Sequence, residues 1–210
     1  TSSSSTHLNG LWSNQNVVNL SVSFSDASTG ANSTSSNLER VWLKVASSTT
    51  PMSVNQIKSG NTSACNSSLT CTIGTSHTLL SGGYSVYVLA EDNAGNQLHQ
   101  VLNLTIAIDV DSPTQNTPSF NQTLSSSNTT TVSWQASIDS HSGVDYYVVN
   151  LSDLDRNATT TQVVQSTSVQ FSDLLEGNYS ACVKTLDNVG LQSANICTPQ
   201  QLRIDYSAPS

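Results

Sequence analysis

Two segments of the chain are nearly alike, and they lie about one small domain apart. Residues 81–97 read SGGYSVYVLAEDNAGNQ and residues 176–192 read EGNYSACVKTLDNVGLQ, at an offset of 95. The identical pairs are Gly82/Gly177, Tyr84/Tyr179, Ser85/Ser180, Val88/Val183, Asp92/Asp187, Asn93/Asn188, Gly95/Gly190 and Gln97/Gln192. This period is too long for a solenoid repeat and suits an independent small domain. We therefore expect two tandem domains, residues 1–111 and 112–210.

Alternation of apolar and polar residues predicts β-strands in both domains. In domain 2 the expected inward positions are Thr130, Val132, Trp134, Ala136, Tyr147, Val149, Leu151, Val169, Phe171, Leu174, Tyr179, Ala181, Val183, Leu202 and Ile204. In domain 1 they are Val18, Leu20, Val22, Phe24, Val41, Leu43 and Val45. Short strands with turn signals every ~8–12 residues are typical of sandwiches. The predicted fold class is all-β, with two tandem antiparallel β-sandwich domains.

Domain 2 contains a tryptophan, a tyrosine and a Leu…Gly…Tyr corner on three of its predicted strands. Trp134 lies on the second predicted strand, Tyr147 lies on the third, and a Leu-Glu-Gly-Asn-Tyr corner at 175–179 begins the sixth. In this order and spacing, residues 112–210 resemble a fibronectin type III domain. The Asp-Asn-x-Gly turn and the Ile-Asp…Pro exit are also similar to bacterial immunoglobulin-like repeats of cell-surface proteins. Domain 1 keeps the corner and the exit, but it has a longer loop within 25–40.

The most similar residues of the two copies have structural roles in this interpretation. We expect the hydroxyl groups of Tyr84 and Tyr179 to bond to backbone upstream, as in a tyrosine corner. In the two Asp-Asn-x-Gly turns, Asp and Asn should bond to local backbone, while Gly supplies a positive φ. Residues that set function are then expected where the two copies differ.

Four cysteines form two local pairs. Cys182 and Cys197 flank the turn near Gly190, so we expect a cross-strand disulfide, and the phase of the strand places Cys182 on the outer face. Cys65 and Cys71 should close a small loop. The spacing does not fit a zinc site, which prefers two to four residues between paired ligands. Disulfides indicate an oxidising compartment, so we predict an extracellular or cell-surface location.

Charge and composition exclude several classes of function. The formal net charge is −8, and the six Lys and Arg residues do not cluster in the sequence, which argues against nucleic-acid binding and a polybasic membrane contact. No apolar run approaches the ~18 residues of a membrane span, so direct membrane insertion is not expected. Apolar residues make up 36% of the chain, while Ser and Thr number 63. We expect thin cores and large polar surfaces.

The sequence contains little that indicates catalysis or a cofactor. No catalytic motif occurs, and His7, His77, His99 and His141 are scattered, so an enzyme is not predicted. Calcium is the one cofactor that the sequence suggests, because hard cations bind several loop oxygens. The candidate ligands are Asp109 and Asp111 near the domain boundary, with Glu91 and Asp92 before a hairpin turn.

Two further sets of residues are candidates for binding or modification. Trp12, Trp42 and Tyr146 could stack on sugars if they are exposed, although a core role is the alternative. Ten Asn-x-Ser/Thr sequons are possible N-glycosylation sites, at Asn19, Asn32, Asn61, Asn66, Asn103, Asn121, Asn128, Asn150, Asn157 and Asn178.

The sequence therefore predicts a non-enzymatic extracellular module, either a spacer or an adhesion segment of a surface protein. One alternative is a subunit of a self-assembling filament that uses sheet-edge strand pairing. Another is a module that binds carbohydrate or protein. The expected partners are other domains of the same polypeptide or identical subunits, with cell-surface glycans or proteins as further possibilities.

Overall fold

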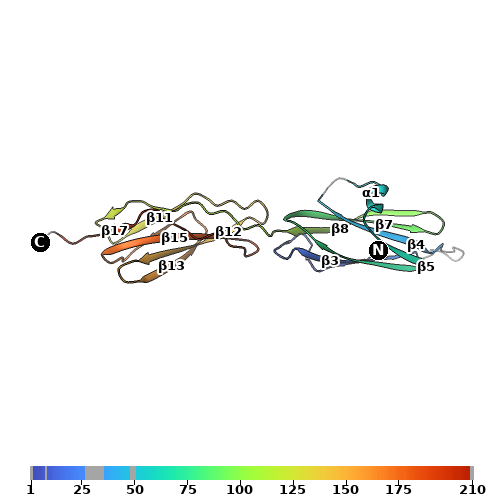
Figure 1. Cartoon of the computed structure of the whole chain (residues 1–210), viewed down its shortest axis with the longest axis horizontal. Coiled ribbons are helices and arrows are strands. Elements are labelled where there is room, and N and C mark those ends of the chain that lie inside the picture. The colour runs from blue at the N-terminus through green and yellow to red at the C-terminus, as the bar shows by residue number, and fades with distance from the viewer. Residues whose placement is uncertain (1, 8, 27–35, 48–50, 209–210) are drawn as a thin grey trace. The chain divides into compact units, whose positions relative to one another are not determined.

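The computed structural model describes residues 2–7, 9–26, 36–47 and 51–208. The chain divides into two compact units, Thr1–Val110 and Asp111–Ser210. Each unit has its own hydrophobic core, and each is built almost entirely from strands (Figure 1).

Unit 1 is a sandwich of two sheets. The smaller sheet has the order β1-β3-β6, and the larger has the order β2-β8-β7-β4-β5. The strands are β1 (Ser2–Ser5), β2 (Trp12–Ser13), β3 (Val17–Ser25), β4 (Leu38–Ala46), β5 (Asn61–Ser68), β6 (Thr70–Thr78), β7 (Gly82–Asp92) and β8 (Gln97–Ile108). The main core lies between the two sheets and takes side chains from both.

Unit 2 repeats this topology, except that two short strands, β16 and β17, take the place of β8. Its smaller sheet is β14-β11-β9, and its larger sheet is β10-β17-β15-β12-β13, with β16 added to β15. The strands are β9 (Ser119–Phe120), β10 (Leu124–Ser125), β11 (Thr130–Ser133), β12 (Val144–Asp153), β13 (Ala158–Val164), β14 (Ser168–Phe171), β15 (Gly177–Asp187), β16 (Ile196–Cys197) and β17 (Leu202–Ile204). The predicted fold class is confirmed, except that the short strands β2 and β10 pair in parallel.

The predicted inward faces agree with the observed burial at most positions. Ala136 is an exception and is exposed, because β11 ends at Ser133 and the alternation of the strand does not extend to it. Val45 and Leu174 are only half-buried, and both pack at the margins of their cores.

A short helix, α1 (Val54–Lys58), was not predicted and distinguishes unit 1 from unit 2. A capping box closes its N-terminus, with Ser53 and Gln56 bonding to each other's backbone. Ile57 of the helix packs on Trp42, Tyr87 and Leu89 on the outer face of the larger sheet, forming a second small core. Since β7 is covered on both faces, five consecutive residues, Val86–Ala90, are buried.

Each unit contains one of the two predicted disulfides. Cys182 and Cys197 are directly opposite on β15 and β16, and their side chains are bonded. Cys182 is half-buried and Cys197 is exposed, so this bond lies on the outer face. Cys65 and Cys71 are bonded and buried where the chain passes from β5 to β6, that is, from one sheet to the other.

The repeated corner and turn make the same hydrogen bonds in both units. The hydroxyl of Tyr84 donates to the carbonyl of Leu80 at 2.9 Å, and that of Tyr179 donates to the carbonyl of Leu175 at 2.8 Å. In the turns, Asp92 and Asp187 each accept two backbone N–H groups within the next four residues. Asn93 and Asn188 each donate to carbonyls of the loop that precedes β4 or β12. The structural interpretation of these residues is confirmed.

Candidate interaction surfaces

The three aromatic candidates for binding differ in exposure. Trp42 is only 7% exposed, so its prediction as a binding residue is wrong. It lies on the outer face of β4, where helix α1 covers it, and a sequence pattern cannot reveal that cover. Trp12 is 37% exposed on β2, and Tyr146 is half-buried on β12 in the other unit.

Two basic side chains surround Trp42. Nζ of Lys58 lies 4.7 Å from the centre of a Trp42 ring, and Cζ of Arg40 lies 5.9 Å from it. Lys58 also pairs with Glu91 at 2.7 Å, and this hydrogen bond is the main cause of a lowered pKa for Glu91. Gln97 donates to the same carboxylate at 3.0 Å. Glu91 is therefore committed to protein partners.

Asp92 is likewise satisfied by its own unit. Its carboxylate accepts from the hydroxyl of Ser36 at 2.6 Å and from the side-chain amide of Asn96 at 2.8 Å, in addition to the turn N–H groups. These bonds, led by that of Ser36, lower the pKa of Asp92 to about 2. Glu91 and Asp92 thus both accept hydrogen bonds from groups of their own unit.

The four acidic candidates for calcium do not form one group. Glu91 and Asp92 end β7, whereas Asp109 follows β8 at the opposite end of the same hairpin. Ten residues of extended strand separate those ends, about 30 Å. Glu91 and Asp92 therefore cannot share one ion with Asp109. Calcium binding by either pair, Asp109 and Asp111 or Glu91 and Asp92, stays a prediction.

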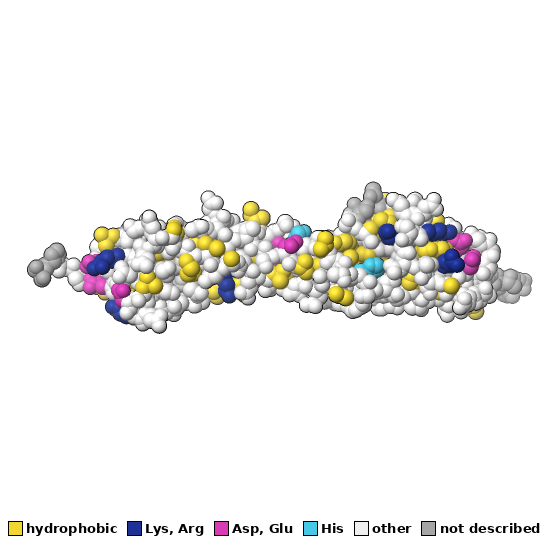
Figure 2. All heavy atoms as spheres, in the orientation of Figure 1, with side chains coloured by type: hydrophobic (Ala, Val, Ile, Leu, Met, Phe, Trp, Pro, Cys, Tyr) yellow, Lys and Arg dark blue, Asp and Glu magenta, His cyan; other side chains and the backbone are white. Residues whose placement is uncertain are grey.

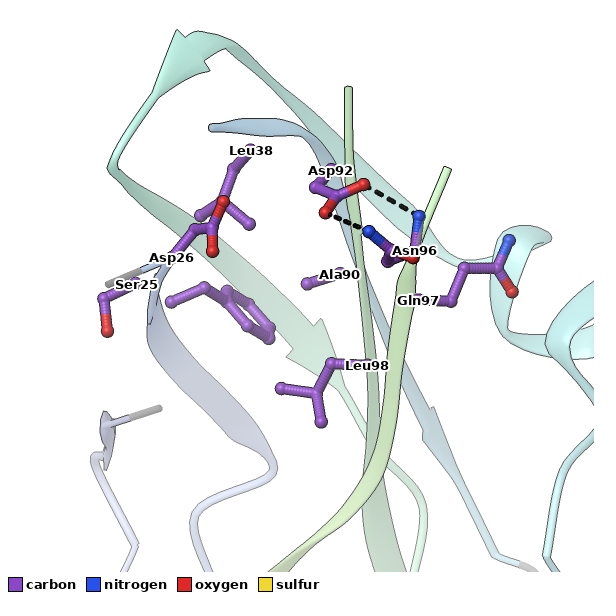
Figure 3. A pocket seen from close by; sticks show the side chains of 9 residues that line it. Ser25, Asp26, Leu38, Ala90, Asp92, Asn96, Gln97 and Leu98 are labelled. Atoms are coloured by element: carbon purple, nitrogen blue, oxygen red, sulfur yellow. Dashed lines mark hydrogen bonds between the residues drawn. The ribbon is translucent and has the colours of Figure 1, made fainter. Parts of the chain in front are cut away.

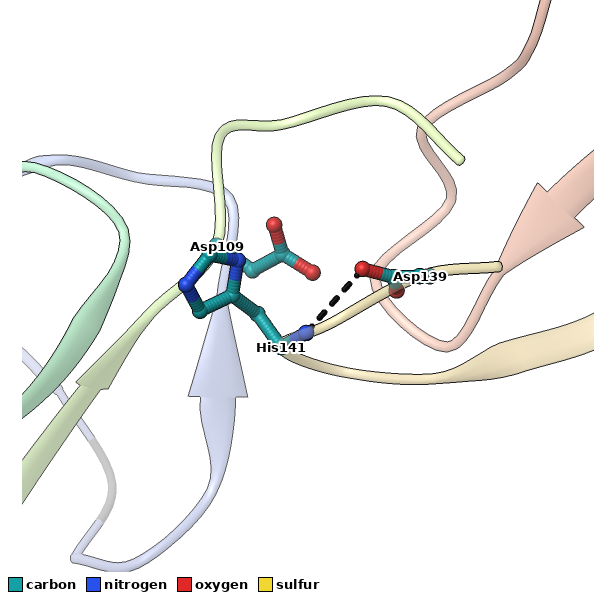
Figure 4. Close-up of side chains that lie close together, drawn as sticks. All are labelled: Asp109, Asp139 and His141. Carbon is teal, nitrogen blue, oxygen red and sulfur yellow. Dashed lines mark hydrogen bonds between the residues drawn. The ribbon is translucent and has the colours of Figure 1, made fainter. Parts of the chain in front are cut away.

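His141 lies beside a serine and a carboxylate, but their geometry differs from that of a catalytic triad. Its Nδ1 lies 3.4 Å from Oγ of Ser140 and 3.6 Å from a carboxylate oxygen of Asp111. A triad histidine uses opposite ring nitrogens for nucleophile and carboxylate, whereas both groups here approach the same nitrogen. The backbone N–H of His141 donates to Asp139, which holds the loop (Figure 4). Turn hydrogen bonds therefore order this loop.

A hollow opens at the end of unit 1 that carries the Asp92 turn. It has a volume of about 220 Å³. Phe24, Leu38, Ala90 and Leu98 line its apolar part, and Asp26 and Asp92 lie on its polar rim (Figure 3). Residues 27–35, which include the sequon at Asn32 and most of the long loop, are outside the described part of the chain.

Much of the visible surface of the units is neither charged nor apolar (Figure 2). Of the sequon asparagines whose side chains are described, Asn19, Asn61, Asn66, Asn121, Asn128 and Asn157 are exposed, while Asn150 and Asn178 are half-buried. None of the described helices has the length and apolar run that crossing a membrane requires. The glycosylation prediction stays a prediction.

Comparison with known proteins identifies the class of the second unit. Residues 111–197 match the model of the fibronectin type III domain. The second unit is therefore a fibronectin type III domain, and the resemblance noted in its sequence is confirmed. No curated protein sequence matches the chain.

Solved structures similar to the chain include several multi-domain fragments. The fibronectin(III)-like modules of Clostridium thermocellum CbhA are 11% identical, with a TM-score of 0.38, over 97% of this chain and 94% of that one. A titin fragment is 13% identical, with a TM-score of 0.48, over 92% and 61%. The FN1 to FN3 domains of chicken CNTN1 are 14% identical, with a TM-score of 0.38, over 93% and 65%. The chain thus spans less than two thirds of the latter two fragments.

Proposed function

We propose that this chain is a non-enzymatic structural module of an extracellular or cell-surface protein, a spacer or adhesion segment. The observation that carries the proposal is that the residues shared by the two units stabilise the β-sandwich itself. Each unit contains a tyrosine corner, a hydrogen-bonded Asp-Asn-x-Gly turn and a disulfide, and these features hold its strands together. Such features resist opening and need no ligand.

Other observations support the extracellular setting. Disulfides persist in oxidising compartments, and both pairs of cysteines in this chain are bonded. The partners in this proposal are neighbouring domains of the same polypeptide. Binding of cell-surface glycans is a weaker alternative, because Trp42 is buried and does not extend a row of exposed aromatic side chains.

Pulling single molecules from their two ends tests the spacer role. A spacer should give two separate unfolding events, one per unit, each resisting force until it unfolds cooperatively. A reductant should lengthen unfolded unit 2 by about 50 Å and unit 1 by about 20 Å, because the disulfides enclose 15 and 6 residues at ~3.3–3.6 Å each. The variant Cys182→Ser/Cys197→Ser is the control and should lose only the larger change. Extension at negligible force, without discrete events, would contradict the proposal.

Assembly through sheet edges is the second candidate function. One observation favours it, namely that no described strand pairs with the outer edge of β8 in unit 1 from Gln97 to Leu102, and it is developed below.

A further inference from the structure

No described strand pairs with the outer edge of β8 over the first half of its length. This strand has 12 residues, Gln97–Ile108, and pairs with β7 along one side. On its other side, β2 covers only Ala107 and Ile108, and Asn9 and Gly10 bond to Thr105. Among the strands that the structure describes, none pairs with this side from Gln97 to Leu102. An open edge presents backbone donors and acceptors to another strand.

The equivalent edge of unit 2 is interrupted. There the last strand is split into β16 (Ile196–Cys197) and β17 (Leu202–Ile204), with Pro199 in the irregular segment between them. Proline and short strands are two devices that prevent edge-to-edge pairing. The disulfide also holds Cys197 against Cys182. One chain therefore contains the same edge in a protected form and in an open form.

The open edge lacks the side chains that usually block strand pairing. Residues 97–104 read QLHQVLNL, with no Lys, Arg, Asp, Glu, Pro or Gly. Two of them are exposed apolar residues, Leu98 at 50% and Val101 at 45%. Leu98 also lines the hollow together with Phe24 and Ala90 (Figure 3). A strand added at this edge would therefore gain apolar contacts as well as backbone hydrogen bonds.

We propose that the β8 edge pairs with the β8 edge of a second copy of this chain. A symmetric pair brings the same short segment of both copies together, so any charge on the segment would face its own copy. With His99 counted as neutral at pH 7, the segment carries no charge and avoids that repulsion, which makes a second copy a better fit than a charged partner strand. This pairing is independent of the spacer role, because a single molecule can carry load with its edge open.

Another uncharged edge strand exists and provides a matched control. β13 (Ala158–Val164) of unit 2 also lies at the edge of its sheet, and Val163 is 61% exposed. This strand is shorter than β8, and the hollow beside β8 belongs to unit 1. A lysine at Val163 changes the charge as much as a lysine at Val101 does, but it leaves the β8 edge intact.

Sedimentation of the whole chain over a wide concentration range tests the proposal. The protein should come from a host that adds no N-linked glycans, because the sequon at Asn103 lies on β8. We expect concentration-dependent dimers for the natural chain and for Val163→Lys. Val101→Lys should raise the dissociation constant at least about tenfold, because it places like charges opposite each other. Circular dichroism and thermal unfolding check that Val101→Lys remains folded.

Ionic strength gives a second readout. Two copies with a formal charge of −8 each repel one another, so salt should strengthen an association that rests on an uncharged edge. Three results would overturn the proposal: a monomer at every concentration, dimers that Val163→Lys weakens as much as Val101→Lys does, or dimers that salt dissociates. None of these results would change the single-molecule pulling experiment.

Discussion

Tyr84 and Tyr179 make the same hydrogen bond, but the two side chains differ in burial. Each hydroxyl donates to a carbonyl four residues upstream, closing the corner that leads into β7 or β15. Tyr179 is 3% exposed, and Tyr84 is half-buried. Loss of the hydroxyl leaves a carbonyl without its donor, and this costs more where water cannot replace it.

We therefore expect Tyr179→Phe to lower the free energy of unfolding of unit 2 by about 1 kcal/mol. Tyr84→Phe should have a smaller effect on unit 1, since water reaches that corner. Denaturant titration followed by circular dichroism measures both changes. Tyr146→Phe is the control, because that hydroxyl makes no hydrogen bond with the described residues. Equal losses for all three variants would argue against the corner bonds.

Asp92 makes the stability of unit 1 depend on pH in acid. Its pKa is lowered from 3.8 to about 2, so the folded state favours the charged form. The stabilisation is present above pH 3.8 and is lost as the pH falls toward 2. Asp92→Asn removes this titration, so the melting temperature of unit 1 should fall less between pH 4 and pH 2 in the variant than in the natural chain. Identical acid profiles of the two proteins would exclude this role.

Residue-level predictions succeeded where the interaction is local in sequence. The tyrosine corners and the Asp-Asn-x-Gly turns bond within a few residues or to one neighbouring loop, and their motifs were sufficient to predict them. The role of Trp42 was not predictable in this way. Its burial depends on Ile57, fifteen residues later, whose contact with the sheet no strand periodicity encodes.

At the level of elements, helix α1 is the clearest difference between the units. It occupies the connection from β4 to β5, where unit 2 has only a short turn between β12 and β13. Ser53 and Gln56 carried the one sequence signal for it, a capping box. Five helical residues are too few to show an amphipathic period, so the alternating strands on both sides dominated the sequence pattern.

Ile57→Ala tests how much this helix contributes. The side chain is fully buried, and its truncation should destabilise unit 1 by about 2–5 kcal/mol. Trp42 would then become more exposed, so its fluorescence should shift to longer wavelength. Asn55→Ala, on the exposed side of the same helix, should change stability by less than about 0.5 kcal/mol. If both variants behave alike, the helix does not support the sheet.

The two disulfides should act on separate units. In the chain-entropy account, closing a loop of 15 residues contributes about 3 kcal/mol, and a loop of 6 residues contributes about 2 kcal/mol. Cys182→Ser/Cys197→Ser should therefore destabilise unit 2, and Cys65→Ala/Cys71→Ala should destabilise unit 1. Differential scanning calorimetry can follow both transitions. A shift of the other unit's transition in either variant would contradict this assignment.

For the whole molecule, the repeat in the sequence was enough to predict two sandwiches, because topology follows from the order of alternating strands and turns. The open edge of β8 was not predictable from that pattern. Whether the outer edge of β8 is paired depends on which strand lies beside it, and that strand can come from a distant part of the sequence. The open edge is recognised when β8 is compared with the interrupted edge formed by β16 and β17 in unit 2.

Each unit should fold without the other. The core of unit 1 contains no residue beyond Ile108, and that of unit 2 contains none before Phe120, among the residues described. Fragments 1–110 and 111–210 should each show one cooperative thermal transition and a strand-rich circular dichroism spectrum. A fragment that is unfolded at low temperature would disprove autonomous folding of that unit.

The placement of the two disulfides has a chemical consequence. Thiol–disulfide exchange requires a thiolate to reach a sulfur atom, and Cys197 is exposed whereas Cys65 and Cys71 are buried. We therefore expect a small reducing agent to reduce the bond of unit 2 faster than the bond of unit 1. The two units should therefore lose their disulfides at different rates under the same reducing conditions.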